Sequence, residues 1–277
     1  MTTIRHPALV PGNVAVITGA ADGIGLAAAG AYAALGLRVC MADIDAEKLR
    51  AAAAEIEGSL AVPTDVSDLA SVQSLATKVR DTHGRVDVLM NNAGIGRLTG
   101  AWNDHEGWQA VLGVNLWGVI NGVQAFTQGM IDQGTPGLII NTGSKQGITS
   151  PPGNPGYNVS KAGVKAVTEA LQHGLRTTEG CQVTAHLLVP GFTYSGMMKP
   201  FLPEKPDSAW TTEQVVEFML ASVERGDFYI LCPDNEVTRE IDDKRMAWTM
   251  GDLIENRPPL SRWHPDYAEA FEKFMKS

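Results

Sequence analysis

Short apolar runs alternate with longer segments of helical spacing along much of the chain. The runs at 86–90 and 138–140 are almost wholly apolar, which is typical of strands covered on both faces. The pattern predicts strands over residues 14–18, 38–42, 60–63, 86–91, 137–142, 182–189 and 228–232. It predicts helices over residues 25–35, 46–57, 67–82, 104–132, 157–178, 211–224 and 235–255, with a short one from about 265. Strands alternating with helices indicate an α/β fold, with one doubly wound parallel sheet of about seven strands and helices on both faces.

Nothing along the chain marks a boundary between two domains. Its 277 residues suit one large α/β domain, and no repeat, low-complexity tract or linker divides them. We therefore expect a single domain over 1–277, with a tail at 1–11 and a C-terminal extension at 234–277. Residues 192–210 lack a regular period and contain three prolines. Irregular loops of this kind commonly close over substrate, so this segment is expected to act as a lid.

The charge balance and the cysteines argue against several classes of protein. The formal net charge of −9 argues against nucleic acid and against anionic membranes as partners. Cys40, Cys181 and Cys232 form no close pair and the six histidines are scattered, so neither disulfides nor a metal site are expected. Residues 1–11 contain no apolar core of signal-peptide length, and no stretch approaches the ~18 apolar residues of a membrane span. The cytoplasm is the expected compartment.

A glycine-rich turn between the first strand and the first helix is a candidate phosphate site. It reads Thr-Gly-Ala-Ala-Asp-Gly-Ile-Gly over residues 18–25. Backbone N–H groups at such a helix N-terminus can bind pyrophosphate, whereas an ordinary glycine-rich turn is the alternative. The residues that would hold a dinucleotide here are Gly19, Asp22, Gly23, Ile24 and Gly25.

Acidic residues at strand ends bear on the choice of cofactor. Asp43 ends the second strand, where a carboxylate could bind the adenosine ribose hydroxyls and would repel a 2′-phosphate. Asp22 adds negative charge nearby, and no Arg or Lys stands at either position to receive a phosphate. Both features favour NAD over NADP, although Asp43 could instead cap the next helix. Asp65 and Val66 follow the third strand and could bracket the adenine, or could simply start a helix.

A serine, a tyrosine and a lysine supply candidate acid–base chemistry. Tyr157 and Lys161 are four residues apart on one helix face, and Ser144 precedes the tyrosine by thirteen positions. A phenol titrates near pH ~10, and a neighbouring ammonium would lower that pKa. Ser144 could then donate a hydrogen bond to a substrate oxygen, so the set could move a proton to or from an alcohol.

Together these residues closely resemble the short-chain dehydrogenase/reductase family. The marks cover about residues 12–195 in family order: the turn at 18–25, Asp43, Asp65-Val66, Asn91-Asn92-Ala93-Gly94, Asn115, Ser144, Tyr157-x-x-x-Lys161 and Pro190-Gly191. The resemblance implies a Rossmann-type sheet with one NAD(P) per chain. It implies that Tyr157 is the acid–base residue, that Ser144 orients the substrate oxygen, and that Lys161 lowers the Tyr157 pKa and binds the nicotinamide ribose. Asn115 would hold a water that links Lys161 to solvent.

The resemblance also assigns the rest of the cofactor cleft and shows two departures. Residues expected to line it are Asn92, Ala93, Gly94, Pro190, Gly191, Thr193 and Ser195, together with Tyr157 and Lys161. Ser195 stands where a threonine is common in the family, and it keeps the hydroxyl. The seventh strand lacks the usual Thr-Gly ending and is followed by a tail of over forty residues, which puts the usual C-terminal interface in doubt.

Substrate contacts are expected beside Ser144 and in the 192–210 segment. The candidates are Lys145, Gln146, Phe192, Tyr194, Met197, Met198 and Phe201. Met and aromatic side chains suit an adaptable apolar pocket, so a bulky apolar or aryl substrate is expected, although about half of these residues could be core. Lys145 could meet an anionic group of the substrate or point to solvent.

The sequence thus predicts an oxidoreductase that transfers a hydride between NAD and a secondary alcohol or ketone. An epimerase or dehydratase that uses NAD internally is the alternative within enzymes. A non-catalytic NAD-sensing protein is the other rival, but such proteins typically lose the Tyr or the Lys. The predicted helices 104–132 and 157–178 carry apolar residues, including Val111 and Val164. The resemblance would pair these helices across subunits, so a homodimer or homotetramer is expected.

Overall fold

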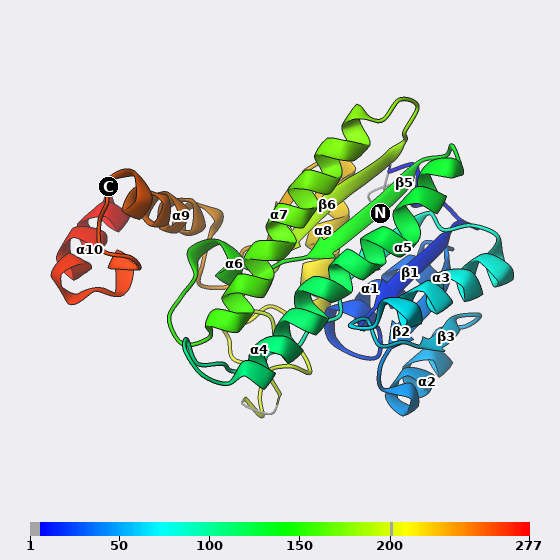
Figure 1. The fold of residues 1–277 in the computed structure, drawn as a ribbon, viewed down its shortest axis with the longest axis horizontal. Coiled ribbons are helices and arrows are strands. Elements are labelled where there is room, and N and C mark those ends of the chain that lie inside the picture. The colour runs from blue at the N-terminus through cyan, green and yellow to red at the C-terminus, as the bar shows by residue number, and fades with distance from the viewer. Residues whose placement is uncertain (1–5, 200–201) are drawn as a thin grey trace.

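Seven parallel strands form one sheet at the centre of the computed structural model, which describes residues 6–199 and 202–277 (Figure 1). Their spatial order is β3-β2-β1-β4-β5-β6-β7. The strands are β1 (Val14–Thr18), β2 (Arg38–Asp43), β3 (Leu60–Pro63), β4 (Val88–Asn91), β5 (Gly137–Thr142), β6 (Val183–Val189) and β7 (Tyr229–Leu231). Every neighbouring pair runs parallel, which confirms the predicted Rossmann-type fold.

Helices cover both faces of the sheet. One face carries α1 (Gly23–Ala34), α2 (Ala46–Ala54) and α8 (Thr212–Arg225), and the other carries α3 (Leu69–His83), α5 (Gly118–Asp132) and α7 (Pro155–Thr177). Successive strand residues alternate between the two apolar layers: Ile17 and Met41 belong to the first, and Val16 and Cys40 to the second. Both faces of the central strands β1, β4 and β5 are therefore buried, as the apolar runs in the sequence predict.

One long helical stretch is interrupted by a wide turn. The helix α4 (His105–Leu112) passes through a π-helical turn at Gly113–Trp117 into α5. The whole stretch, His105–Asp132, is long and apolar enough to cross a membrane by length and composition alone, which is not expected from the sequence. In the fold, its α5 part packs on the sheet. Val111 and Val164, expected on the surface of these helices, are fully buried, whereas Trp117 is 54% exposed.

Several helices begin where a side chain caps them rather than where the apolar pattern predicts. The helix α1 starts two residues early because the Asp22 carboxylate accepts a hydrogen bond from the N–H of Gly23. Asp68, rather than Ser67, caps α3. The helix α9 (Arg239–Ile254) starts at 239 instead of 235 because Thr238 caps it. Residues before these caps stay in turns, since a cap needs a non-helical backbone.

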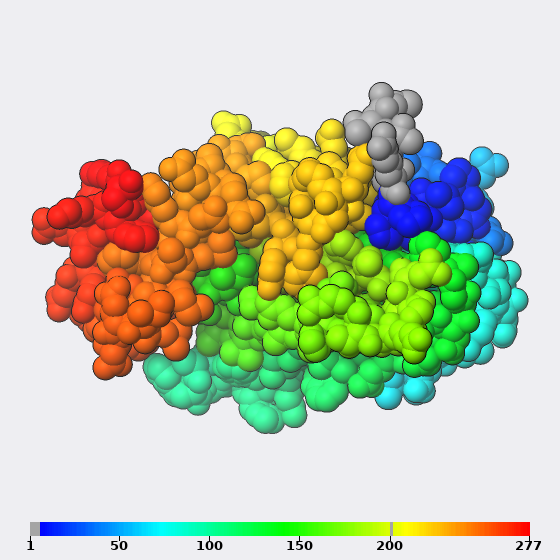
Figure 2. Space-filling view, turned by 90° about the horizontal axis from the view of Figure 1, so that it is seen from above, coloured from blue at the N-terminus to red at the C-terminus, as the bar shows by residue number. Residues whose placement is uncertain are grey.

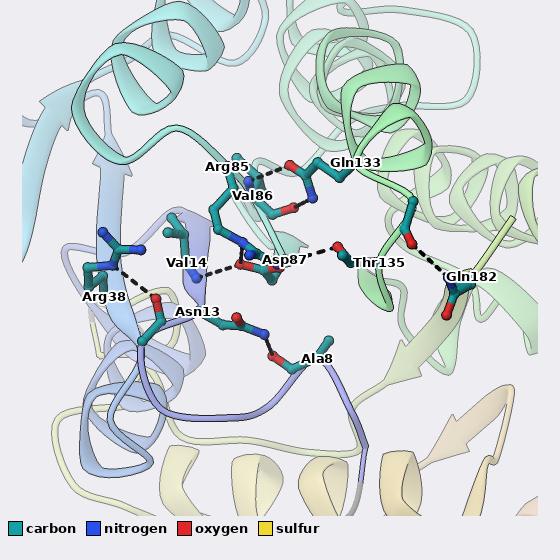
Figure 3. Close-up of polar contacts among 12 residues, drawn as sticks. Ala8, Asn13, Val14, Arg38, Arg85, Val86, Asp87, Gln133, Thr135 and Gln182 are labelled. Atoms are coloured by element: carbon teal, nitrogen blue, oxygen red, sulfur yellow. Dashed lines mark hydrogen bonds and ion pairs between the residues drawn. The ribbon is translucent and has the colours of Figure 1, made fainter.

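A polar cluster ties the amino ends of β1 and β4 together, on the side away from the strands' carboxyl ends (Figure 3). The enclosed carboxylate of Asp87 accepts hydrogen bonds from Arg85 and from the N–H of Val14, at 2.9 Å for the latter. Both backbone groups of Val86 bind the side-chain amide of Gln133 at 2.8 Å. Val86 is thereby removed from the ladder, so β4 starts at Val88 and not at 86 as expected.

The chain beyond β7 forms an extension at one end of the molecule, opposite the N-terminal part (Figure 2). It comprises α9, two short 3₁₀ turns (Ser261–Trp263 and Pro265–Tyr267) and α10 (Ala268–Lys276). The extension has a small core of its own, in which Trp248 packs against Phe271 and Phe274 with ring centroids 5.2 and 5.3 Å apart. It meets the body where α9 contacts the short helix α6 (Gln146–Thr149).

Candidate active site

A cleft of about 830 Å³ opens at the carboxyl ends of the central strands. Open α/β sheets bind their ligands at this edge. The cleft brings together most of the predicted cofactor and catalytic residues, namely Gly19, Asp22, Gly23, Ile24, Asp43, Asn92, Ala93, Gly94, Ser144, Tyr157, Lys161, Pro190, Gly191, Thr193 and Ser195. Segments far apart in the sequence therefore meet here because each follows a strand of one sheet.

The glycine turn is packed against the residues that follow β4. Gly19 has a φ of +65°, and a Cβ there would lie 2.7 Å from the Cα of Ala93, so only glycine fits. A Cβ on Gly25 would collide with the carbonyl of Gly19, which makes Gly25 a packing glycine behind the turn. The Thr18 hydroxyl accepts hydrogen bonds from the N–H groups of Asn92 and Ala93, at 3.0 and 3.1 Å. No sequence pattern indicates this contact of Thr18, because it depends on β1 and β4 being neighbours.

A lysine stands beside the acidic residues of the cleft, contrary to expectation. Lys48, in the first turn of α2, lines the cleft and places its ammonium 2.5 Å from Asp22. Burial alone would raise the pKa of Asp22, but the hydrogen bonds from Lys48 and Gly23 and the lysine charge lower it overall. Asp43 accepts backbone hydrogen bonds from Ala21 and from residue 45, both at 3.1 Å. No Arg or Lys stands at the position of either carboxylate in the sequence, but the fold brings Lys48 of α2 to Asp22.

Asp65 and Val66 lie outside the lining of this cleft. The Asp65 carboxylate accepts hydrogen bonds from the backbone and hydroxyl of Ser67, at 2.9 and 2.7 Å. Val66 is buried in the layer between the sheet and α3 and α5. Asp65 thus shapes the turn that precedes the Asp68 cap of α3, and the expected contact of Asp65 and Val66 with the adenine stays a prediction.

Ser144, Tyr157 and Lys161 lie close together, with an electrostatic balance that differs from the predicted one. Burial raises the pKa of Tyr157, and a hydrogen bond with Ser144 only partly opposes that rise. Burial lowers the pKa of Lys161 to about 8. Its Nζ donates to the carbonyl of Thr142 at 2.8 Å and lies 5.7 Å from the Tyr157 ring centroid. The pKa of Tyr157 is thus raised overall because burial outweighs the Ser144 hydrogen bond, and the expected lowering of this pKa by Lys161 stays a prediction.

Asn115 occupies the π-helical turn and is fully enclosed. Its Oδ1 accepts from the N–H of Ile95 at 2.7 Å, and its Nδ2 donates to the carbonyl of Ile95 at 3.0 Å and to Ser160 Oγ at 3.2 Å. The Ser160 hydroxyl in turn donates to the carbonyl of Tyr157 at 2.7 Å. Asn115 therefore ties the loop after β4 to the first turn of α7. Its role in holding a relay water stays a prediction.

The substrate end of the cleft includes most, but not all, of the expected residues. Lys145, Gln146, Phe192, Met197 and Met198 line it, joined by Gly96 and Arg97, which the sequence did not suggest. Tyr194 instead lines a groove between α1 and α8 and donates its hydroxyl to the carbonyl of Pro203 at 2.9 Å. Its backbone N–H also donates to the carbonyl of Trp210 at 2.9 Å, and neither Trp210 nor Pro203 lines the cleft. Phe201 lies outside the described residues.

The Lys145 ammonium is paired with two carboxylates, instead of pointing to solvent as one of the two sequence-based alternatives had it. Its ammonium lies 2.6 Å from Asp242 on α9 and 3.7 Å from Asp234 after β7. Both carboxylates belong to the end of the chain, which sequence reasoning connected to no site. Across residues 6–199 and 202–277, no group of three or more His, Cys, Asp or Glu side chains could hold a metal ion.

Comparison with known proteins agrees with this geometry. Residues 13–206 match the protein family described as short chain dehydrogenase. The chain belongs to this family. D-threitol dehydrogenase of Mycolicibacterium smegmatis is 38% identical over 165 residues, which are 58% of this chain and 63% of that protein. The 1-deoxy-11-beta-hydroxypentalenate dehydrogenase of Streptomyces exfoliatus is 30% identical and aligns over 91% of this chain and 94% of its own length.

Solved structures of short-chain dehydrogenases superpose on most of the chain. One from Burkholderia phymatum in complex with NAD has a TM-score of 0.79 and 31% identity, covering 90% of this chain and 96% of that one. A metagenomic short-chain oxidoreductase in complex with NADP has a TM-score of 0.67 and 30% identity, covering 81% and 98%. This short-chain dehydrogenase is therefore an NAD(P)-dependent oxidoreductase that interconverts alcohols and ketones. The cleft fits such a cofactor, since the glycine turn, the N-terminus of α1 and Asp43 border it.

Proposed function

We propose that this dehydrogenase transfers a hydride between NAD and a bulky, largely apolar secondary alcohol or its ketone, with Tyr157 as the acid–base residue. The observation that carries the proposal is that Ser144, Tyr157 and Lys161 border the same cleft as the glycine turn. A proton-transfer group and a dinucleotide site thus share one enclosed space, as hydride transfer to a ketone requires.

Ser144 and Tyr157 have different roles at the substrate oxygen. When bound, the nicotinamide ring supplies or accepts the hydride. Ser144 donates a hydrogen bond to the substrate oxygen, and the Tyr157 hydroxyl exchanges a proton with it. Lys161, held by the carbonyl of Thr142, would bind the cofactor ribose and would favour the phenolate form of Tyr157 through its charge. Asn115 keeps the loop after β4 against α7, which fixes Tyr157 relative to the cofactor cleft.

The preference for NAD over NADP is supported by charge. Asp43 lines the cleft at the end of β2, where its carboxylate would bind ribose hydroxyls and repel a 2′-phosphate. Lys48 also lines the cleft, but its charge is already paired with Asp22 at 2.5 Å. The adenine would lie toward Asp65 and Val66, as the family resemblance implies.

A bulky apolar substrate is supported by the lining of the cleft. Phe192, Met197 and Met198 come from the 192–210 segment and leave mainly apolar surface there. The pentalenate dehydrogenase named above aligns over nearly its whole length, whereas the threitol dehydrogenase aligns over less than two thirds of its own. The apolar lining favours the first kind of substrate over a polyol. We further propose that residues 192–210 act as a lid, that the chain is one domain, and that it works in the cytoplasm.

Replacement of Tyr157 by Phe tests the proposed function. Turnover should fall by ~10²–10⁴-fold, the range for general acid–base catalysis, while NAD binding is largely kept. NAD reduction should be assayed across aliphatic, aryl and terpenoid or steroid secondary alcohols, with NAD affinity measured by fluorescence titration. Tyr229→Phe is the matched control, because its hydroxyl binds Glu169 on the surface, outside the cleft, and its turnover should be unchanged. Wild-type turnover in Tyr157→Phe would rule out the assignment.

A further inference from the structure

Lys145 connects the candidate catalytic serine to the C-terminal extension. It follows Ser144 directly and starts the turn that leads into α6. The Ser144 Oγ accepts a hydrogen bond from the N–H of Gln146 at 3.2 Å, so the backbone around Lys145 sets the position of the serine hydroxyl. The Lys145 ammonium meets Asp242, in the first turn of α9, at 2.6 Å.

Asp234 links Lys145 to two more segments that border the cleft, those that follow β6 and β7. Its Oδ2 lies 3.7 Å from Lys145 Nζ and accepts a hydrogen bond from the N–H of Phe192 at 3.2 Å. Its Oδ1 accepts from the N–H groups of Glu236 and Val237, which fixes the chain just before α9. The segments that follow β5, β6 and β7 are thereby joined through one lysine and one carboxylate.

These charges are enclosed and depend on one another. The exposed side-chain fractions are 18% for Lys145, 6% for Asp234 and 7% for Asp242. Burial and the neighbouring Asp234 raise the pKa of Asp242, while Lys145 and Arg245 lower it in part. Removing one partner of such a cluster leaves an uncompensated buried charge, so the ion pair holds its backbone segments firmly.

We propose that Asp242 and Asp234 position Lys145, and through it Ser144, so that the C-terminal extension is part of the active-site scaffold. Lys145 is a positioning residue here, since it acts on the substrate oxygen only through the serine. This inference rests on the proposed role of Ser144 and Tyr157. It gives a function to α9, which follows the family match at 13–206.

Variants of the ion pair test the inference. Lys145→Met and Asp242→Asn should each lower kcat by roughly 10–100-fold, because small misplacements of a catalytic group cost rates of this order. The Kd for NAD should change less than about twofold. The kcat of the double variant should be no lower than the lower kcat of the two single variants, because both substitutions remove the same ion pair. Lys145→Arg keeps the charge and should recover most of the turnover.

Asp243→Asn is the matched control, because this neighbouring carboxylate pairs with Arg239 on the exposed side of α9 and its loss should leave kcat unchanged. Hydrogen exchange gives a readout independent of activity: amides of 144–149 should exchange faster in Asp242→Asn and not in Asp243→Asn. If Asp242→Asn fails to fold, Asp242→Glu keeps the charge but displaces it, and an intermediate loss of kcat is expected.

Wild-type kcat and unchanged exchange in Lys145→Met or Asp242→Asn would overturn the inference, as would losses that multiply in the double variant. These failures differ from failure of the proposed function, in which Tyr157→Phe itself stays active. A uniform fall in thermal stability, with kcat per folded molecule unchanged, would also count against positioning.

Discussion

The Lys161 ammonium is bound to the carbonyl of Thr142, the last residue of β5, at 2.8 Å. It lies 5.7 Å from the centroid of the Tyr157 ring. The sheet therefore fixes the position of the lysine ammonium, whereas α7 fixes the position of the Tyr157 ring. Burial of the charged ammonium lowers the stability of the fold, and the ammonium borders the cleft where a ligand could bind it.

The buried lysine should make stability depend on pH. Burial lowers the Lys161 pKa from 10.5 to about 8, so between these values the unfolded chain binds more protons than the folded one. The free energy of unfolding of the cofactor-free wild type should therefore rise relative to Lys161→Met from about pH 8 to 10.5, by at most about 3 kcal/mol. Urea unfolding at pH 7.5 and 10 measures this. Lys165→Met, at a partly exposed lysine one turn on, should show no such trend. A difference between wild type and Lys161→Met that stays constant with pH would contradict the lowered pKa.

Asp43 and Lys48 should have opposite effects on cofactor choice. Wild type should use NAD with a higher kcat/KM than NADP. Asp43→Ser should narrow or reverse the preference, because the carboxylate that repels a 2′-phosphate is gone while Lys48 remains. Adding Lys48→Ala to Asp43→Ser should restore part of the discrimination by weakening NADP. Equal use of both cofactors by wild type would refute the charge argument.

The lid segment should move in its middle and stay fixed at its base. Its ends are joined by two backbone hydrogen bonds of 2.9 Å, from Tyr194 to Trp210 and from Trp210 to Phe192. Hydrogen exchange should show slow amides at these three positions in the free enzyme. The amides over 196–199 and at 202, 204 and 205 should exchange faster than these and become protected with NAD and substrate. Met197→Ala should alter substrate preference more than NAD affinity. Full protection of these amides in the free enzyme would show that the segment is packed core.

Trp117 should contribute to a subunit interface. It is 54% exposed at the end of the π-helical turn, between α4 and α5, and Val159 on α7 is 47% exposed. A dimer or tetramer that uses these helices should bury more than roughly 1,000 Å² in total. Trp117→Glu should shift the protein toward monomer in light scattering at micromolar concentration. Trp102→Glu, at a tryptophan that is 91% exposed on the loop before α4, is the control. A monomeric wild type would overturn the prediction.

The sheet and the catalytic triplet could be predicted from the sequence because both depend on local spacing. Each strand is an apolar run, and Tyr157 and Lys161 are neighbours on one helix. The strand-end residues of the cleft follow from the same rule, since parallel strands bring their carboxyl ends to one edge.

Other features depend on tertiary contacts that no local pattern carries. Lys48 reaches Asp22 only because α2 returns beside the glycine turn, and Asp242 reaches Lys145 only because α9 folds onto α6. Tyr194 lines the groove between α1 and α8 instead of the cleft, where its hydroxyl binds the carbonyl of Pro203, a contact within the irregular segment that has no sequence pattern. The raised Tyr157 pKa reflects burial, which the spacing of residues does not reveal.

The wide turn at Gly113–Trp117 gives the long helix one residue more than α-helical winding requires. Each helical residue advances the direction of the side chain by ~100°, so the loss of a single residue there would rotate one half of the helix against the other. Asn115 would then point away from Ile95, and the loop after β4 would lose its attachment. In this stretch the residue count matters as much as residue identity: an insertion or deletion is expected to be more damaging than most substitutions.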